Sequence, residues 1–368
     1  MTAFNVNKEQ LLPALAIVAG AVDRKQAFPI LANFLITLKN HFMTITATDL
    51  EIEVSAELPI TYEDEPLSFT VPAKKMMDII RALEDKLEPS FSLQQDLFII
   101  KEKRSQFKLA TMPAEDFPAS KQDASVIELS LPRLAFLHLL QSTHFAISQQ
   151  EVRAYLNGLL LEFNPKSITA VATDGHRLAL NQIEIVQEPA FHRILLPRKG
   201  VQEVLKLLAH CEDETIQLFA GLDHFKLVTK QFVLFSSLIE SRFPPYAKAI
   251  PKDHDKTVVV DTDALKRSLS RIVILANEKS RAIIMQIEPN LLTIIANNQE
   301  KEEAFDAIEA ETTGGAVKIG LNANYLIDVL SYISDSKVKI SLGTEDDSIL
   351  IESMSDAAYR YIIMPMKI

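Results

Sequence analysis

Cysteine, tryptophan and glycine are scarce in this chain. Its 368 residues include one cysteine, Cys211, no tryptophan and nine glycines. A single cysteine excludes an intrachain disulfide and a zinc site built from several cysteines, and it is typical of the reducing cytoplasm. Neither the dinucleotide pattern Gly-x-Gly-x-x-Gly nor the phosphate-binding pattern Gly-x-x-x-x-Gly-Lys-Ser/Thr occurs. We therefore expect no nucleotide cofactor.

Long apolar stretches are missing as well. Apolar residues make up 48% of the chain, yet no uninterrupted run approaches the ~20 residues that a membrane-spanning helix needs. The first residues, Met1 to Asn5, lack the basic and apolar regions of a secretory signal. We expect a cytoplasmic protein with no membrane partner.

The chain also lacks the signatures of a catalytic site. Asp174 and His176 lie two residues apart, but no nucleophile of the Gly-x-Ser-x-Gly type accompanies them, so we interpret their turn as structural. Cys211 follows a helical segment and is predicted to pack rather than react. The eight histidines show no metal-ligand spacing such as His-Glu-x-x-His. We expect neither catalysis nor a metal or other cofactor.

The most informative feature that is present is a threefold internal repeat. Thr48-Asp49 and Thr173-Asp174 are 125 residues apart, and Asn297-Asn298 follows 124 residues later. A period this long indicates repeated domains rather than the short units of a solenoid. It also fits the usual size of a domain. We expect three domains, spanning residues 1–125, 126–254 and 255–368.

Each repeat contains the same predicted elements. Apolar residues spaced i, i+3/i+4 and i+7 predict two helices per repeat: 8–22 and 72–83, 132–147 and 197–209, 262–276 and 322–333. Pro72 and Pro197 are predicted to occupy a first helical turn. Alternating apolar residues between the helices predict antiparallel strands. The fold class is therefore α+β, with antiparallel sheet covered on one face by two helices per domain.

Charge is distributed unevenly between the helices and the rest of the chain. The net charge is −11, yet the six helical segments carry 11 Lys or Arg and 5 Asp or Glu, a net +6 that leaves −17 elsewhere. Lys266, Arg267 and Arg271 lie opposite the apolar stripe of their helix. Helices that shared one surface would make it basic and suited to a polyanion. Exposed helix faces also carry Lys and Arg without any such role, so this alternative stays open.

Several motifs, taken in order, resemble those of the bacterial DNA polymerase III β subunits, the sliding-clamp family. The resemblance runs from Phe4 to Ile368 and rests on Pro29-Ile30-Leu31, Thr48-Asp49-Leu50-Glu51, Tyr155-Leu156-Asn157-Gly158, Val171 to Leu178, Pro197-Arg198-Lys199-Gly200, Arg242-Phe243-Pro244 and Met364-Pro365-Met366. Each motif alone is weak, whereas their joint order is specific.

The resemblance implies a non-catalytic processivity factor. It implies a head-to-tail homodimeric ring of six domains, with helices around a central hole and sheets outside. Double-stranded DNA would pass through the hole and be held through its phosphates without sequence readout. Ala154 replaces a residue that is often aromatic in the family, which weakens the DNA contact of its loop. The implied DNA contacts, with the two helix-face residues from the charge pattern, are Arg24, Lys25, Gln150, Tyr155, Lys199, Lys266 and Arg267.

The resemblance also implies which edges meet in the homodimer. Apolar side chains would form the centre of the interface and opposite charges its rim. Without the family, the charged runs are equally typical of solvated loops. The implied interface residues are Lys103, Arg104, Phe107, Leu109, Ile274, Leu275, Glu300, Glu302 and Glu303.

A partner pocket between the second and third domains is the last implication. The replicative polymerase catalytic subunit, the clamp loader and other replication and repair proteins would each insert a short motif with Gln, Leu and Phe side chains. Lys248 stands where the family often has Arg, and Ser280 where an aromatic residue occurs, so we expect a more open pocket and roughly micromolar affinities. The implied pocket residues are Leu156, Thr173, Gly175, His176, Arg177, Leu178, Pro244, Lys248, Ala249, Asn322, Tyr325, Ser348, Ile362, Ile363, Met364, Pro365 and Met366.

One other function class stays open from the sequence. It is an acidic three-domain scaffold that binds partners through the same pocket and does not hold DNA.

Overall fold

The computed structural model describes residues 2–23, 28–85, 88–118, 124–252, 254–356 and 358–367. Two of the expected DNA contacts, Arg24 and Lys25, lie outside these ranges. Within them, every strand pairing is antiparallel, as the sequence predicted. No described helix is both long enough and apolar enough to cross a membrane.

The same order of elements returns three times. The first repeat contains β1 (Thr2–Asn5), α1 (Lys8–Val18), η1 (Ala19–Ala21), η2 (Pro29–Ala32), β2 (Asn33–Lys39), β3 (Phe42–Thr48), β4 (Ile52–Pro59), β5 (Leu67–Pro72), α2 (Ala73–Ala82), β6 (Ser90–Gln94), β7 (Leu97–Glu102), β8 (Ser105–Ala110) and η3 (Ala114–Asp116). The second contains β9 (Ile127–Pro132), α3 (Arg133–Gln141), η4 (His144–Ala146), η5 (Ala154–Asn157), β10 (Gly158–Asn164), β11 (Ser167–Thr173), β12 (Arg177–Glu184), β13 (His192–Pro197), α4 (Arg198–His210), β14 (Thr215–Ala220), β15 (His224–Val228), β16 (Phe232–Ser237) and η6 (Tyr246–Lys248). The third contains β17 (Lys256–Asp261), α5 (Thr262–Ile272), β18 (Ala282–Glu288), β19 (Leu291–Asn297), β20 (Glu303–Thr313), β21 (Val317–Asn322), α6 (Ala323–Leu330), β22 (Lys337–Leu342), β23 (Ile349–Ser353) and β24 (Arg360–Ile363).

The chain forms two compact units, and their boundary falls inside the second repeat. One unit comprises Met1–Leu134 with Lys199–Leu238, and the other comprises Ala135–Arg198 with Ile239–Ile368. The second repeat divides because each of its sheets continues into a neighbour: β16 pairs with β4 of the first repeat, and β12 pairs with β24 of the third. The expected domain boundaries at residues 125 and 254 mark the sequence repeat and stay a prediction.

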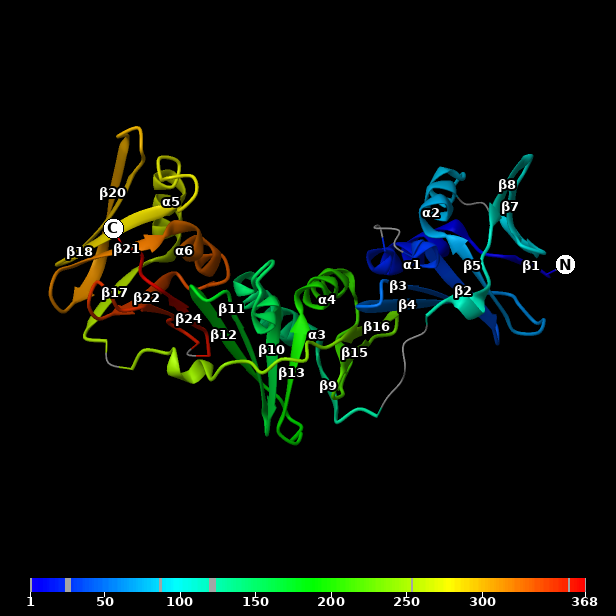
Figure 1. Ribbon diagram of the computed structural model, residues 1–368, viewed down its shortest axis with the longest axis horizontal. Helices are drawn as coiled ribbons and strands as arrows, with labels where there is room; N and C mark the ends of the chain where they lie inside the picture. The colour runs from blue at the N-terminus through cyan, green and yellow to red at the C-terminus, as the bar shows by residue number, and fades with distance from the viewer. Residues whose placement is uncertain are drawn as a thin grey trace. The chain divides into compact units, whose positions relative to one another are not determined.

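In its described residues, the first unit combines two sheets and three α-helices. Its strands run in the orders β5-β2-β3-β4-β16-β15-β14-β9 and β1-β6-β7-β8. Strand β2 alternates the fully buried Phe34, Ile36 and Leu38 with more exposed residues, as expected for a sheet covered on one face. Helices α1 and α2 lie side by side over that face and bury residues such as Leu11 and Met76 (Figure 1). This packing of apolar stripe on apolar sheet face forms the core of the first repeat.

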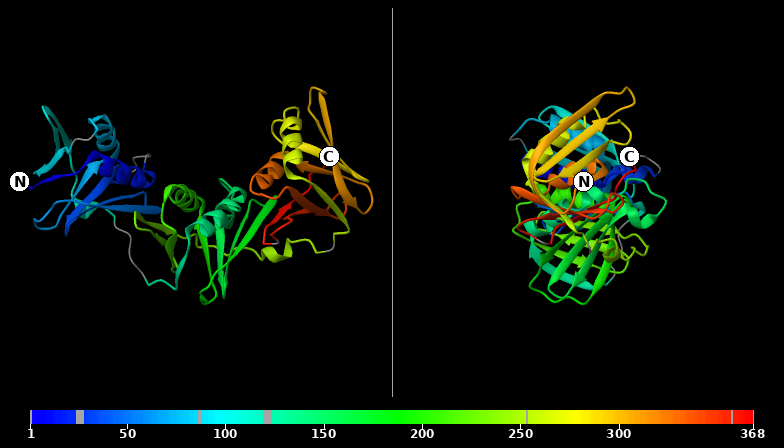
Figure 2. Two further views of the ribbon diagram at one scale, coloured as in Figure 1. Left: turned by 180° about the vertical axis from the view of Figure 1, so that it is seen from behind. Right: turned by 90° about the vertical axis from the view of Figure 1, so that its left-hand side faces the viewer.

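The second unit has the same layering on a longer sheet. The order of its strands is β13-β10-β11-β12-β24-β23-β22-β17-β20-β19-β18-β21. Helices α5 and α6 pack side by side against it (Figure 2). The stripe predicted for α5 is buried, with Leu265 and Leu269 at 0% exposure and Ile272 at 3%. Asp261 caps this helix by accepting a hydrogen bond from the backbone N–H of Ala264 at 2.7 Å.

The predicted helix ends were wrong in several places. Helix α1 ends at Val18 and continues as the tight turn η1, and α3 ends at Gln141 before η4. Apolar spacing persists through such 3₁₀ turns, so periodicity alone does not separate them from an α-helix. Pro72 and Pro197 are not in a first turn. Each is the last residue of a strand, and its helix begins at the next residue.

Candidate functional site

The turn between β11 and β12 is built by side chains that cap its backbone. The Oδ1 atom of Asp174 accepts hydrogen bonds from the N–H groups of His176 and Arg177 at 2.9 and 3.0 Å. The hydroxyl of Thr173 donates to the carbonyl of Arg177 at 2.6 Å. Gly175 has a φ of +90°, where a side chain would be strained. Asp174 and Thr173 therefore serve the turn, which is structural as the sequence predicted.

Arg177 connects this turn to α6. Its guanidinium donates to Asp174 Oδ2 at 3.0 Å, to Asp328 Oδ2 at 2.5 Å and to the carbonyl of Phe145 at 2.7 Å. It also lies over the ring of Tyr325, 4.4 Å from the centroid. Because the Arg177 side chain is only 12% exposed, these charge-assisted contacts hold it in one position. Burial, and secondarily the carboxylate of Asp174, raises the pKa of Tyr325, so its hydroxyl remains a donor at neutral pH.

The C-terminal strand brings the tail of the chain beside the same turn. In the β12–β24 ladder, Ile362 stands opposite Leu178. The tail then follows the turn, because the N–H of Met364 donates to the carbonyl of His176 at 2.9 Å. The N–H of Met366 donates to a β21 carbonyl at 2.8 Å. Met364 is 50% exposed, which leaves its flexible thioether accessible to a ligand.

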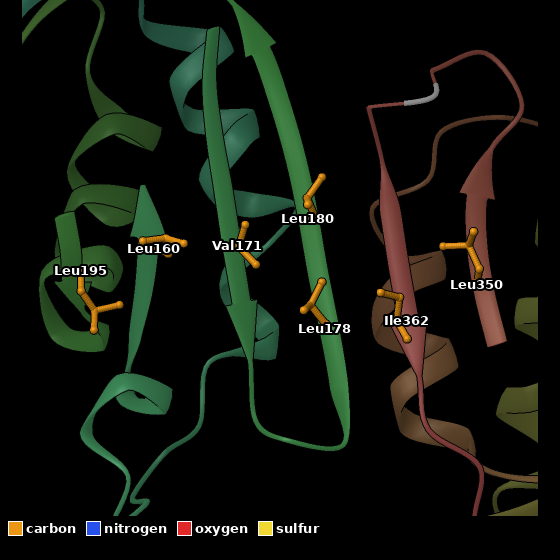
Figure 3. Close-up of a cluster of buried hydrophobic side chains, with 7 residues drawn as sticks. All are labelled: Leu160, Val171, Leu178, Leu180, Leu195, Leu350 and Ile362. Carbon is orange, nitrogen blue, oxygen red and sulfur yellow. The ribbon is translucent and has the colours of Figure 1, made fainter. Parts of the chain in front are cut away.

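An apolar cluster lies on the strands next to the turn. Figure 3 shows its seven side chains on six adjacent strands: Leu160, Val171, Leu178, Leu180, Leu195, Leu350 and Ile362. Five partly buried residues pack against it: Tyr155, Ile239, Phe243, Tyr246 and Ile250. An apolar floor with incomplete cover is suited to Leu and Phe side chains of a short peptide.

Residues 239–250, which we term the strap, border this cluster. The strap starts where the N–H of Ile239 donates to the carbonyl of Leu195 in β13, at 2.9 Å. It carries three of the expected pocket residues, Pro244, Lys248 and Ala249, and all three are exposed. The strap therefore lies against the apolar cluster and carries expected pocket residues on its exposed side.

The remaining expected pocket residues lie on elements around this centre. Asn322 ends β21 and caps α6 by accepting a hydrogen bond from the N–H of Asn324 at 2.9 Å. Leu156 is buried in η5, next to Tyr155. Ser348 immediately precedes β23. The structure thus gathers the turn, the tail, the strap and α6 in one unit, and the pocket assignment itself stays a prediction.

The junction of β4 with β16 repeats this geometry with different side chains. Asp49 Oδ1 accepts two backbone hydrogen bonds at 3.0 Å, as Asp174 does in its turn. In the β4–β16 ladder Glu53 faces Phe235, where the β12–β24 ladder has an aliphatic pair. A carboxylate at this position does not suit an apolar ligand. This difference favours the second junction as the peptide site.

Comparison with known proteins decides the family. Family models for the DNA polymerase III beta subunit match residues 2–121 with its N-terminal domain, 130–245 with its central domain and 247–367 with its C-terminal domain. The beta sliding clamp of Pseudomonas aeruginosa is 37% identical over 366 residues, which are 99% of this chain and 100% of that protein. The chain belongs to the DNA polymerase III beta subunit family. The beta sliding clamp of Escherichia coli is 35% identical over 365 residues, 99% of this chain and 100% of that protein.

A solved beta subunit has the same fold. The crystal structure of DNA polymerase III subunit beta from Pseudomonas aeruginosa superposes with a TM-score of 0.96 at 36% identity and covers 100% of both chains. The expected three-domain α+β fold is therefore confirmed. Beta subunits are processivity factors rather than catalytic enzymes.

Several basic helix residues have partners within this beta subunit. Lys8 is 8% exposed and donates to the carbonyl of Leu83 at 2.5 Å. The ammonium of Lys199 contacts the buried carboxylate of Asp49. Arg271 pairs with a carboxylate of β20, Asp306, and this hydrogen bond lowers the pKa of the acid. The charge count made from the sequence therefore overestimates the free positive charge, because ion pairs between distant segments are invisible to it.

The other expected DNA contacts differ in exposure. Arg267 and Gln150 are exposed, and Lys266 is half-buried on α5. Tyr155 packs against Phe243, with 6.3 Å between ring centroids, and so faces the apolar cluster. These assignments stay predictions.

The expected interface residues lie on β8 and the turn before it, in the segment after α5, and before and at the start of β20. Lys103 and Arg104 form the exposed β7–β8 turn, and Glu300, Glu302 and Glu303 are exposed before and at the start of β20. Ile274 is 74% exposed, Leu275 and Phe107 are half-buried, and Leu109 is only 7% exposed. Leu109 already belongs to the core of its own sheet and adds little apolar area to any interface.

Three residues that contact the turn or the strap were missed from the sequence: Asp328 bonds to Arg177, Tyr246 packs on the apolar cluster, and Glu162 accepts a hydrogen bond from Tyr246. Asp328 lies 151 residues from Arg177, and no spacing pattern links them. Glu162 reads as one more residue of a strand. Tyr246 follows the Arg242-Phe243-Pro244 motif closely, and that position offered the one usable signal.

Proposed function

We propose that this beta subunit is a DNA sliding clamp. Two copies join head to tail into a ring around double-stranded DNA, and the ring tethers the replicative polymerase, the clamp loader and other replication and repair proteins. The proposal places the protein in the cytoplasm. It is supported by the family and by the way the repeats pair along the chain. The domain limits 1–125, 126–254 and 255–368 belong to the same proposal.

The main support for the ring is a strand pairing that recurs between successive repeats and leaves one strand edge over at each end of the chain. The strand after each Asp-bearing turn pairs with the last strand of the next repeat, β4 with β16 and β12 with β24. The equivalent strand of the third repeat is β20, whose residues 303–309 pair with β19 on one side. The last strand of the first repeat is β8, at the edge of its sheet. Pairing β20 with β8 of a second copy, twice, closes six repeats into a ring.

The repeat also supports one particular register for this proposed pairing. Glu303 occupies in the β19–β20 ladder the place that Leu178 has in β11–β12. The strands β1-β6-β7-β8 of the first repeat correspond to β17-β22-β23-β24 of the third. In this correspondence Lys108 on β8 is the equivalent of Ile362 on β24. Because Leu178 and Ile362 face each other, Glu303 of one copy is expected to face Lys108 of the other. Opposite charges on directly facing residues stabilise a strand pair.

An exposed apolar side chain supports the same contact. Ile274 is the equivalent of Phe145, since each lies 12 residues after the start of its helix. Phe145 stacks on Tyr332, just after α6, with 5.3 Å between ring centroids. The equivalent place for Ile274 is beside α2 of the second copy. A cavity of about 580 Å³ opens there, lined in part by Phe34 and Met77.

One observation favours the alternative of a scaffold that does not hold DNA. The pairing of Lys199 with Asp49 and of Arg271 with Asp306 removes cations from the helix faces. The experiment must therefore reverse charges that are exposed or half-exposed on α5. Lys199 is unsuitable because a carboxylate beside buried Asp49 would damage the fold.

The test is retention on circular DNA by a variant carrying Lys266→Glu and Arg267→Glu. Purified protein is loaded on nicked circular DNA by its clamp loader and separated by gel filtration before and after the DNA is linearised. We expect the wild type to stay on circles and to leave linear DNA, since a ring slides off an end. The variant should load several-fold less, because two phosphate contacts become repulsive.

The matched control carries Lys39→Glu and Lys166→Glu, at hairpin turns of the first and second repeats. It changes the net charge equally and should load normally. Wild-type protein that stays on linear DNA argues against encirclement. Normal loading of the α5 variant argues against these DNA contacts and for the scaffold.

A further inference from the structure

We propose that Arg193 and Tyr246, bound to the buried carboxylate of Glu162, form an anchor that fixes the strap and thereby positions one wall of the partner pocket. This inference rests on the peptide binding proposed above. All three act as positioning residues, since the wall itself is formed by Pro244, Lys248 and Ala249.

The anchor is a buried carboxylate with both oxygens engaged. The Glu162 side chain is 5% exposed on β10. Its Oε1 accepts a hydrogen bond from Nε of Arg193 at 2.5 Å, and its Oε2 accepts one from the hydroxyl of Tyr246. Arg193 in turn lies over the ring of Phe191, 5.0 Å from the centroid. A desolvated carboxylate is tolerated when its lone pairs are filled in this way, and its partners are then held in defined positions.

Tyr246 transmits this position to the strap. It lies two residues after Pro244 and two before Lys248, and its carbonyl accepts a hydrogen bond from the N–H of Ala249 at 2.9 Å. Its ring meets that of Phe243 edge-on, with 6.4 Å between centroids. Burial, with the carboxyl of Glu162 second, raises the pKa of Tyr246, so its hydroxyl stays protonated and donates at neutral pH.

The equivalent positions in the other repeats show that the strand does not require the charge. The strand registers show that Thr37 on β2 of the first repeat and Gln286 on β18 of the third are the equivalents of Glu162 on β10. Thr37 bonds to a neighbouring serine hydroxyl, and Gln286 to Glu288. Of the three equivalent positions, Glu162 is the one that carries a carboxylate, and this carboxylate accepts a hydrogen bond from the strap residue Tyr246. An apolar residue would pack there without the desolvation cost, whereas an ionic anchor fixes direction as well as contact.

The test compares Tyr246→Phe with the wild type in binding a fluorescent Gln-Leu-x-Leu-Phe peptide to the full chain. The substitution keeps the ring and removes the donor to a buried carboxylate, so affinity should fall about tenfold. Tyr62→Phe is the matched control. It removes a hydroxyl that donates to the carbonyl of Glu65 at 2.6 Å in the other unit, and it should leave the affinity unchanged.

A double-mutant cycle separates positioning from general stability. Lys248→Ala should weaken peptide binding in the wild type and have little further effect in Tyr246→Phe, because the displaced strap no longer presents Lys248. The same substitution should be additive with Tyr62→Phe. Additive effects with Tyr246→Phe would overturn the positioning role. If that variant does not fold, Arg193→Met supplies the second test, since Arg193 is 56% exposed.

Hydrogen exchange of the strap distinguishes failure of this inference from failure of the proposed function. Removing the anchor should speed exchange at the N–H groups of Ile239 and Ala249 with no peptide present. Unchanged exchange and unchanged peptide affinity in Tyr246→Phe would sink the anchor. Faster exchange, together with no peptide binding by the wild type, would keep the anchor and reject the pocket.

Discussion

The pairing of Lys108 with Glu303 across the proposed interface gives a direct test of the ring. Both residues are exposed in the single chain. Lys108 is not among the interface residues that the family resemblance implied. The perturbation is Lys108→Glu, which places two carboxylates opposite each other. The rescue is the same chain with Glu303→Lys added, which restores an opposite-charge pair in the reverse orientation.

The magnitude follows from the geometry of facing residues. A facing opposite-charge pair contributes roughly 0.2–1 kcal/mol, and like charges cost a similar amount, so reversal changes each contact by about 0.4–2 kcal/mol. A head-to-tail dimer contains the contact twice. The dimer should therefore weaken by about 0.8–4 kcal/mol, which is roughly 4- to 700-fold in the dissociation constant. Added salt should shrink the effect, because the pair lies at an exposed rim.

Sedimentation equilibrium over a dilution series measures this dissociation constant. Lys39→Glu, in a hairpin of the same repeat, is the control for net charge and should dimerise like the wild type. The reasoning is refuted if Lys108→Glu dimerises normally. It is also refuted if the double variant, folded by circular dichroism, fails to recover most of the lost affinity.

Two further results are expected. Deleting residues 364–368 should lower affinity for the Gln-Leu-x-Leu-Phe peptide at least about tenfold in fluorescence anisotropy, because the tail carries pocket side chains. The fold should stay intact, because the tail makes few backbone hydrogen bonds. Equal affinities of the two proteins would contradict the pocket. Hydrogen bonds from Ser353, Ser355 and Met354 lower the pKa of Asp335 to about 2, against an unfolded value of about 3.9. Its stabilisation is present above about pH 4 and is lost as the pH falls toward 2. Asp335→Asn should therefore cost about 1 kcal/mol at pH 7, a figure reduced for solvent exposure, and almost nothing near pH 2; a difference in melting temperature that stays constant with pH would contradict this.

The sequence by itself determined the repeat, the fold class and the family. Helical stripes such as Leu265, Leu269 and Ile272, and the alternation along β2, are local patterns with periods of 3.6 and 2, so each can be recognised without knowing what it packs against. The Thr-Asp turn was likewise readable, because its hydrogen bonds close within four residues. Motif order then identified the family where no single motif sufficed.

The tertiary structure decided which side chains meet. Arg177 reaches Asp328 across 151 residues, Lys199 pairs with Asp49, and Glu162 receives Tyr246 from the strap. None of these contacts leaves a periodic signal, because each depends on strands and helices from different repeats being brought together. The same is true of β8 and β20. Their equivalents in the other repeats pair with each other within the chain, and we propose that these two strands pair between two copies. The period of the apolar residues determines whether a segment forms a helix or a strand. Long-range packing determines which charged side chains stay unpaired at the surface and where a peptide can bind.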